Sequence, residues 1–143
     1  MTTRVWVDGS TKEVCFVIEG YGTAILPLGE RTTNNRGEYR ALIKALLNLK
    51  SLGIGDALIF SDSELIVNQV NSLLNPSFTP YYKVKNPELK RRAEIAAMLM
   101  NTVGATLSWL PREENKAGII LEEHQKAQRS TRNKKIKEEK HGN

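Results

Sequence analysis

The spacing of apolar residues changes at Asn34, and this change constrains the fold more than any other feature of the sequence. Residues 4–8, 14–19 and 21–28 are rich in β-formers and separated by glycine-containing turns, which predicts a three-stranded antiparallel meander. Beyond Asn34 the apolar residues recur at helical spacing until Gly53, which predicts a helix with one buried side.

The rest of the chain alternates between helical and strand patterns. A short, continuously apolar run at 56–61 is typical of a strand that is buried on both faces. This order predicts an α/β fold in which a mixed five-stranded sheet, the meander plus two parallel strands, carries helices on both faces. The other expected elements are helices at 62–74, at 88–101 and from 114 to about 129, a strand at 105–109, and a loop rich in proline and aromatic residues at 75–87.

At 143 residues the chain has enough apolar material for one domain with its own core. No segment reaches the length of a membrane span and the N-terminus has no secretory pattern, so we expect a cytoplasmic protein without a membrane partner. The single cysteine, Cys15, excludes an internal disulfide and is expected in the core. The sequence indicates no protein partner.

The formal net charge of +5 lies entirely near the end of the chain. Residues 1–124 contain 14 basic and 14 acidic side chains, whereas residues 125–143 contain seven basic side chains and two acidic ones. Two interpretations of this basic segment stay open: an arm that binds a polyanion such as nucleic acid, or a solvated terminus. We therefore expect a folded domain over 1–128 and a basic, flexible tail over 129–143.

Three acidic residues are expected at one edge of the sheet. Asp8 ends the first strand, and Asp62 follows the buried strand at its carboxyl end, where ligands of open α/β sheets usually sit. Glu38 lies on the apolar side of the first helix and so points at the sheet. At about 4 Å, two carboxylates repel each other by roughly 1 kcal/mol in water and about 4 kcal/mol at an effective dielectric of about 20. The cluster therefore predicts a divalent metal site.

Each acid also has an ordinary structural interpretation. Asp8 followed by Gly9 fits a hairpin turn, and Glu38 complements a helix dipole. Asp62 lies in a segment that fits a capping box. Taken singly these interpretations are the stronger ones, but together they leave the convergence of the three acids unexplained.

Five short segments carry further information: AspGlySer (8–10), ThrAsnAsnArgGlyGlu (33–38), SerAspSer (61–63), LysValLysAsnPro (83–87) and TrpLeuProArgGluGluAsnLys (109–116). In this order they resemble the signatures of the ribonuclease H type 1 family. Each segment is weak alone, but five in the family order are specific. The resemblance covers about residues 4–125 and implies the ribonuclease H-like fold.

The resemblance implies a metal-dependent endonuclease that hydrolyses the RNA strand of an RNA–DNA hybrid and leaves 5′-phosphate and 3′-hydroxyl ends. It also implies two Mg²⁺ ions about 4 Å apart, with Mn²⁺ as a substitute, one to activate water and one to stabilise the leaving oxygen. In the implied site Asp8 binds both ions and Asp62 binds the ion on the nucleophile side. Glu38 binds the other ion and accepts from a ribose 2′-hydroxyl.

The resemblance also implies substrate contacts. Arg36 is predicted either to meet a phosphate or to cover the surface, and Arg112 to be an assisting cation or a rim residue. Asn86 suits the start of a helix equally well, because Asn caps helices and proline suits the first turn. The short polar side chains that match positions contacting the DNA phosphate and the minor groove are Thr33, Asn34, Asn35 and Asn86.

The match breaks at the start of the last helix. The family pattern places a fourth acid where this chain has Ile119, and isoleucine cannot bind Mg²⁺. Three explanations stay open: the three remaining acids suffice, Glu122 or Glu123 reaches back from the same helix face, or catalysis is weakened or lost while hybrid binding is kept. A related nuclease that acts on DNA is a further alternative. Neither His124 nor His141 is expected to be catalytic.

Overall fold

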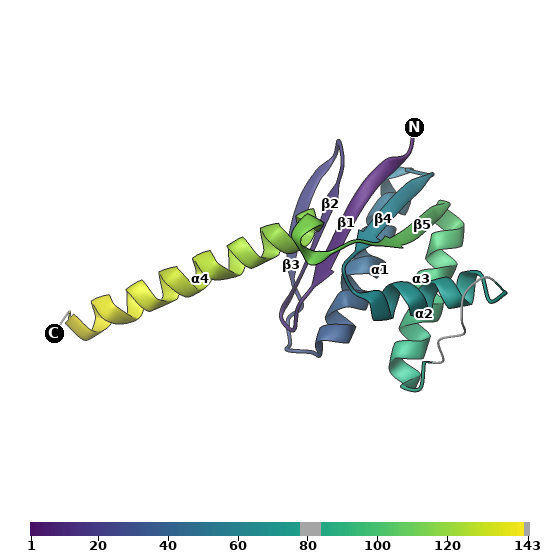
Figure 1. Ribbon diagram of the computed structural model, residues 1–143. Helices are drawn as coiled ribbons and strands as arrows, with labels where there is room; N and C mark the ends of the chain where they lie inside the picture. The colour runs from purple at the N-terminus through teal and green to yellow at the C-terminus, as the bar shows by residue number, and fades with distance from the viewer. Residues whose placement is uncertain (78–83, 142–143) are drawn as a thin grey trace.

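The computed structural model describes residues 1–77 and 84–141. One sheet contains all five strands in the order β3-β2-β1-β4-β5 (Figure 1), where β1 is Thr3–Gly9, β2 is Glu13–Ile18, β3 is Gly22–Pro27, β4 is Ala57–Ser61 and β5 is Ala105–Trp109. The pairs β1–β2 and β2–β3 are antiparallel, whereas β1–β4 and β4–β5 are parallel. The predicted meander with two added parallel strands is therefore confirmed.

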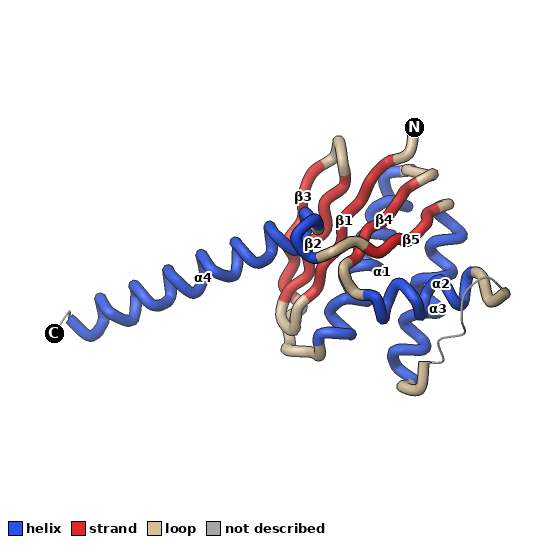
Figure 2. The backbone as a smooth tube through the Cα atoms, in the orientation of Figure 1, coloured by secondary structure: helices blue, strands red, loops and turns tan. Residues whose placement is uncertain are grey.

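Helices cover both faces of the sheet. The main core joins one face of the sheet to three helices, α1 (Asn34–Leu52), α2 (Glu64–Leu74) and α3 (Pro87–Val103). On the other face, Trp6 and Cys15 pack against Ala117 and Leu121 near the start of α4 (Lys116–His141), preceded by the short turn η1 (Arg112–Glu114). Figure 2 shows α4 leaving the sheet in the direction opposite to α2 and α3. Cys15 is buried, as predicted.

Helix boundaries follow from local capping. The Thr33 hydroxyl accepts a hydrogen bond from the backbone N–H of Arg36 at the start of α1, and Gly53 ends that helix with φ 69°. Ser63 caps α2 by accepting from the N–H of Ile66. Because the cap is Ser63, Asp62 stays outside the helix and its carboxylate is free to face the sheet edge.

The last helix is longer than predicted. It was expected to end near Arg129, but α4 continues to His141. Residues 125–141 contain no glycine or proline and are rich in Lys, Gln and Glu, which favour helix, and Lys126 pairs with Glu122 one turn away at 3.3 Å. The segment predicted to be a flexible tail is thus helical as far as His141, and a domain boundary at residue 128 stays a prediction.

The connection between α2 and α3 is described only at its ends. The predicted loop at 75–87 includes residues 78–83, which lie outside the described residues. Within the described ranges, no helix combines the length and the apolar character that crossing a membrane requires.

The end of β1 and the start of α1 touch through backbone atoms. A β-carbon at Gly9 would lie 2.0 Å from the carbonyl oxygen of Gly37, and one at Gly37 would lie 2.0 Å from the carbonyl oxygen of Ser10. Only residues without a side chain permit this approach. The contact brings Asp8 beside Glu38, because each acid is the immediate neighbour of one of these glycines.

We expect Gly37→Ala to lower the free energy of unfolding by about 1–3 kcal/mol, because the added methyl group must push the helix away from the strand. Urea unfolding followed by circular dichroism measures this change. Gly55→Ala is the control, since a β-carbon there would lie at 3.4 Å from the carbonyl oxygen of Val103. Equal stability of the two variants would contradict the close backbone contact.

Candidate metal centre

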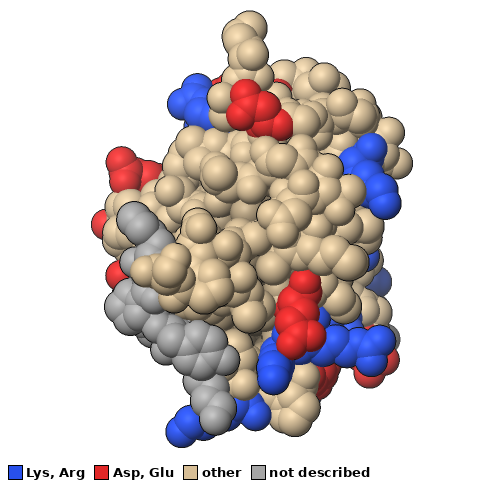
Figure 3. All heavy atoms as spheres, turned by 90° about the vertical axis from the view of Figure 1, so that its right-hand side faces the viewer, with Lys and Arg blue, Asp and Glu red and all other residues tan. Residues whose placement is uncertain are grey.

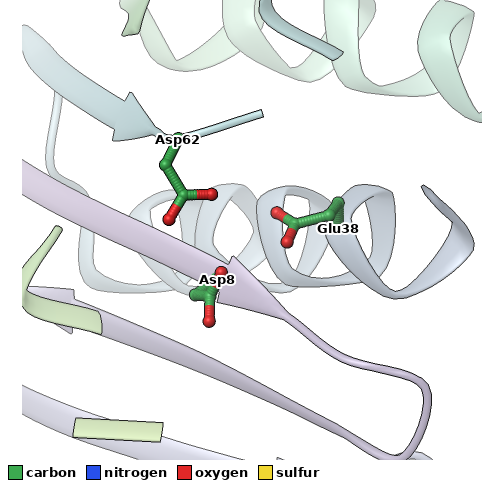
Figure 4. A group of neighbouring side chains, drawn as sticks. All are labelled: Asp8, Glu38 and Asp62. Atoms are coloured by element: carbon green, nitrogen blue, oxygen red, sulfur yellow. The ribbon is translucent and has the colours of Figure 1, made fainter. Parts of the chain in front are cut away.

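Three half-buried carboxylates meet at one edge of the sheet. Asp8 comes from the end of β1, Glu38 from near the start of α1, and Asp62 from the residue after β4. Each offers an oxygen atom that lies within 4.8 Å of those offered by the other two. Figure 4 shows the three side chains pointing toward one another. The structure therefore brings together the three acids singled out in the sequence.

Parallel strand pairing explains part of this convergence. In the β1–β4 pair, Trp6 lies opposite Phe60. Asp8 and Asp62 each follow two residues later, so both emerge at the same edge. Glu38 arrives from a different element, through the glycine contact between β1 and α1.

Asn115 is a positioning residue whose only signal in the sequence is its place in the segment 109–116 that resembles the family. Its side chain is fully buried, and its Nδ2 donates to the carbonyl oxygen of Val7 at 3.0 Å and to Oδ2 of Asp62 at 3.2 Å. Its Oδ1 accepts from the N–H of Ala117 at 3.2 Å, at the start of α4. One amide thus joins β1, the Asp62 carboxylate and the start of α4.

Trp109 fixes the backbone beside the same acid. Its indole Nε1 donates to the carbonyl oxygen of Asp62 at 3.1 Å. The ring itself remains substantially exposed. The bond therefore fixes the chain just beyond β4 and limits the directions available to the Asp62 carboxylate.

The electrostatics of the cluster are unfavourable without a cation. Burial raises the pKa of Glu38 to about 9, and the negative charges of Asp8 and Asp62 add to the effect. Burial and the charge of Asp62 raise the pKa of Asp8 to about 6, against the lowering influence of a Glu38 hydrogen bond and of Arg112. Within the described structure, Oε2 of Glu38 is buried without a hydrogen-bond partner. A divalent cation would remove all of these penalties.

The surroundings suit a hard cation and a ligand beside it. The acids lie in a hollow of about 330 Å³. Carboxylate oxygens are the ligands that Mg²⁺ prefers in proteins, so the residues present fit this ion. The other residues that line the hollow are Gly9, Ser10, Asn34, Asn35, Ser63, Arg112, Gly118, Leu121, Glu122 and Gln125.

The residues predicted to contact substrate divide into two groups. Asn34, Asn35 and Arg112 line the hollow, whereas the remaining three do not. Arg36 forms an ion pair with Glu88, which ties the start of α1 to the start of α3. Thr33 caps α1, and Asn86 caps α3 through its Oδ1, which accepts from two backbone N–H groups. The helix-start interpretation of Asn86 therefore applies, and its contact with substrate stays a prediction.

The helix α4 approaches the acids through Gly118 rather than through Ile119. A β-carbon at Gly118 would lie 3.5 Å from Oδ2 of both Asp8 and Asp62. Ile119 is 42% exposed and is absent from the lining of the hollow. Glu122 lines the hollow, one turn after Gly118.

The other residues considered on this helix face elsewhere. Glu123 is exposed and does not line the hollow. His124 points to Glu13, with 3.2 Å between its Nε2 and the carboxylate. Of the two candidates for an additional acid, only Glu122 is thus near the cluster.

This chain matches a known protein family and is similar to curated proteins. The family described as reverse transcriptase-like matches residues 19–124. The "Bifunctional protein Rv2228c" of Mycobacterium tuberculosis is 34% identical over 86 residues, which are 59% of this chain and 21% of that protein. The chain thus spans about a fifth of the length of the curated relatives it matches.

Two solved structures are similar over most of their length. The structure of LC11-RNase H1 in complex with RNA/DNA hybrid is 28% identical with a TM-score of 0.65, covering 80% of this chain and 89% of that chain. RNase H1 from the halophilic archaeon Halobacterium salinarum is 24% identical with a TM-score of 0.69, covering 82% and 91%. The second likeness supports the fold alone.

The raised pKa values predict how the stability of the metal-free protein changes with pH. The folded protein holds protons on Asp8 and Glu38 up to about pH 6 and about pH 9, whereas their ordinary pKa values are 3.8 and 4.5. The folded state therefore binds more protons than the unfolded chain in this window, and stability falls as pH rises through it. We expect the Tm in EDTA to drop by several degrees between pH 5 and pH 9.

Two comparisons test the cause of that drop. Glu38→Gln should flatten the pH dependence, because the amide cannot ionise, and Mg²⁺ should raise the Tm more at pH 8 than at pH 5. Glu94→Gln, an exposed position on α3, is the matched control. If Glu38→Gln keeps the wild-type pH profile, the acid cluster is not the source.

Proposed function

This chain belongs to the ribonuclease H type 1 family, and we propose that it is a metal-dependent endonuclease that hydrolyses the RNA strand of RNA–DNA hybrids. The observation that carries the proposal is the meeting of carboxylate oxygens from Asp8, Glu38 and Asp62 within 4.8 Å. The similar LC11-RNase H1 is known in complex with RNA/DNA hybrid, which supports the same substrate class. The proposed products carry 5′-phosphate and 3′-hydroxyl ends.

Each acid has a distinct proposed task. When bound, two Mg²⁺ ions, or Mn²⁺ in their place, would activate the attacking water and stabilise the leaving 3′ oxygen. We assign Asp8 to both ions and Asp62 to the ion beside the water. Glu38 is assigned to the second ion. Glu38 is also the proposed acceptor from a ribose 2′-hydroxyl, a group that only RNA offers.

The side chains around the acids suit a nucleic-acid backbone. Asn34 and Asn35 line the hollow and offer short neutral donors, which can hold a phosphate or a base edge without demanding a sequence. Arg112 adds a positive charge near Asp8 and is the proposed assisting cation. Thr33 and Asn86 are also proposed to contact DNA. In helix capping their side-chain oxygens accept hydrogen bonds, so the O–H of Thr33 and the side-chain NH₂ of Asn86 are the proposed donors to DNA. Arg36 is proposed to meet a phosphate from its place beside Glu88.

A catalytically weakened or silent hybrid-binding module is the second candidate. It is favoured by the α4 side of the hollow, where Gly118 faces the acids with no carboxylate of its own. Ile119, at the position of the fourth family acid, supplies none either. Such a protein would bind the hybrid but hold its cations more weakly.

Cleavage of a labelled RNA–DNA hybrid in Mg²⁺, and separately in Mn²⁺, decides between the two candidates. We expect cutting of the RNA strand, and a loss of about 100-fold or more in rate with Asp8→Asn, because one of three metal-binding carboxylates is removed. Glu94→Gln should cleave like the wild type. Binding without cleavage in either metal would leave only the silent module, and equal cleavage of all-DNA duplex would indicate a DNA nuclease.

Glu122 and Glu123 separate the explanations for the missing fourth acid. Glu122→Gln should raise the Mg²⁺ concentration needed for half-maximal cleavage by about tenfold, because loss of an outer carboxylate typically weakens metal affinity by this amount. Glu123→Gln removes the same charge from the next residue, which lies outside the hollow, and should behave like the wild type. A titration of rate against Mg²⁺ concentration measures both. Identical curves for the two variants would mean that Asp8, Glu38 and Asp62 suffice.

A further inference from the structure

A second hollow, of about 430 Å³, adjoins the acid site. Three residues line both hollows: Ser10 from the turn between β1 and β2, Asn34 from the start of α1, and Gln125 from α4. Because the two share this wall, a ligand that lies over the acids and extends past Gln125 enters the second hollow.

The second hollow is strongly basic. Four cationic side chains line it, and the only acid there is Glu13. The Glu13 carboxylate already has two partners. It accepts a hydrogen bond from Gln125 Nε2 at 3.2 Å and lies 3.2 Å from His124 Nε2. None of the four cations forms an ion pair with another residue of the described structure. They come from three segments of the chain and are Lys12, Arg31, Arg129 and Arg132.

Hydrogen bonds hold the three segments in place. Gln125 Nε2 donates to Ser10 Oγ at 3.1 Å, which fastens α4 to the β1–β2 turn. The N–H of Thr32 donates to the carbonyl oxygen of Thr11 at 2.8 Å, which fastens the segment before α1 to the same turn. These hydrogen bonds therefore fix the segments that line the hollow relative to one another. Unpaired cations gathered on a concave surface attract an anion.

The basic residues of α4 do not all share this position. Arg129 and Arg132 line the hollow, whereas Lys134 and Lys137 do not and lie along another side of the same exposed helix, at a groove that Arg129 also lines. The face of the molecule that looks away from α4 carries scattered charges of both signs among mostly uncharged atoms (Figure 3). The hollow lined by Arg129 and Arg132 thus differs from the other basic surface of α4 in its position next to the acids.

We propose that this hollow binds a backbone phosphate of the nucleic acid whose scissile bond lies over the three acids. The proposal rests on the proposed function, because it takes the substrate to be a polynucleotide. Arginine suits this ligand, since its planar guanidinium matches two phosphate oxygens at once. The hollow would therefore hold the strand at a point beyond the reacting bond and orient it.

The test compares two double variants with the same change in charge. Arg129→Gln with Arg132→Gln removes the arginines of the hollow, and Lys134→Gln with Lys137→Gln removes two charges from the other face of α4. All four side chains are exposed, and the Tm of each variant checks folding. Fluorescence anisotropy without divalent metal measures the affinity for a labelled hybrid at several salt concentrations, so that binding is read independently of cleavage.

We expect the arginine variant to lower the slope of log affinity against log salt by about one, since each phosphate contact contributes about 0.9. The lysine variant should lower it by less than about half that amount. The difference should disappear on hybrids shortened until they no longer reach the hollow. Equal effects of the two variants, or a difference that persists on the shortest hybrid bound, would overturn the proposal.

The experiments distinguish failure of the phosphate site from failure of the proposed function. If the wild type binds the hybrid through the arginines but does not cleave it, the phosphate site stands and the proposed catalysis fails. If cleavage occurs and the two variants bind alike, the catalysis stands and the phosphate site fails.

Discussion

Repulsion among Asp8, Glu38 and Asp62 is the constraint around which the rest of this structure is organised. The fold buries these carboxylates against one another and leaves an oxygen of Glu38 without a partner in the described structure. Nearby groups offset only part of the cost: Asn115 donates to Asp62, and Arg112 and the backbone N–H of Gly9 lower the pKa of Asp8, which still stays raised. The protein thus gives up stability that a bound divalent cation would restore.

Rigid elements hold the acids against this repulsion. Parallel pairing of β1 with β4 fixes Asp8 relative to Asp62, and the contact between Gly9 and Gly37 fixes Glu38 relative to Asp8. Both devices are backbone contacts, so they fix the main-chain positions from which the carboxylates extend. Asn115 adds a buried link from the start of α4 to β1 and to the Asp62 carboxylate. Preorganisation of this kind is what metal-assisted hydrolysis requires, because the ligands must not rearrange during the reaction.

The sequence predicted those features that local patterns determine. Apolar spacing located the strands and helices, and the rule that parallel strands end at one edge located Asp8 and Asp62. Features that depend on contacts between distant segments were missed. The backbone contact at Gly37 needs the relative position of two elements, and the role of Asn115 needs the partner atoms that only the folded chain supplies. The continuation of α4 to His141 was missed because basic charge was interpreted as disorder, although the same residues are good helix formers.

The absence of a carboxylate at Gly118 and Ile119 has two opposing physical consequences. One negative charge fewer weakens the attraction for Mg²⁺ but also reduces the repulsion that a phosphodiester meets on approaching Asp8 and Asp62. The same helix then places Arg129 and Arg132 three turns further along, at the adjoining hollow. Positive charge beside the site and reduced negative charge within it act in the same direction, toward binding a polyanion. If the proposed phosphate site holds, α4 would thus favour binding of the strand over binding of the cations.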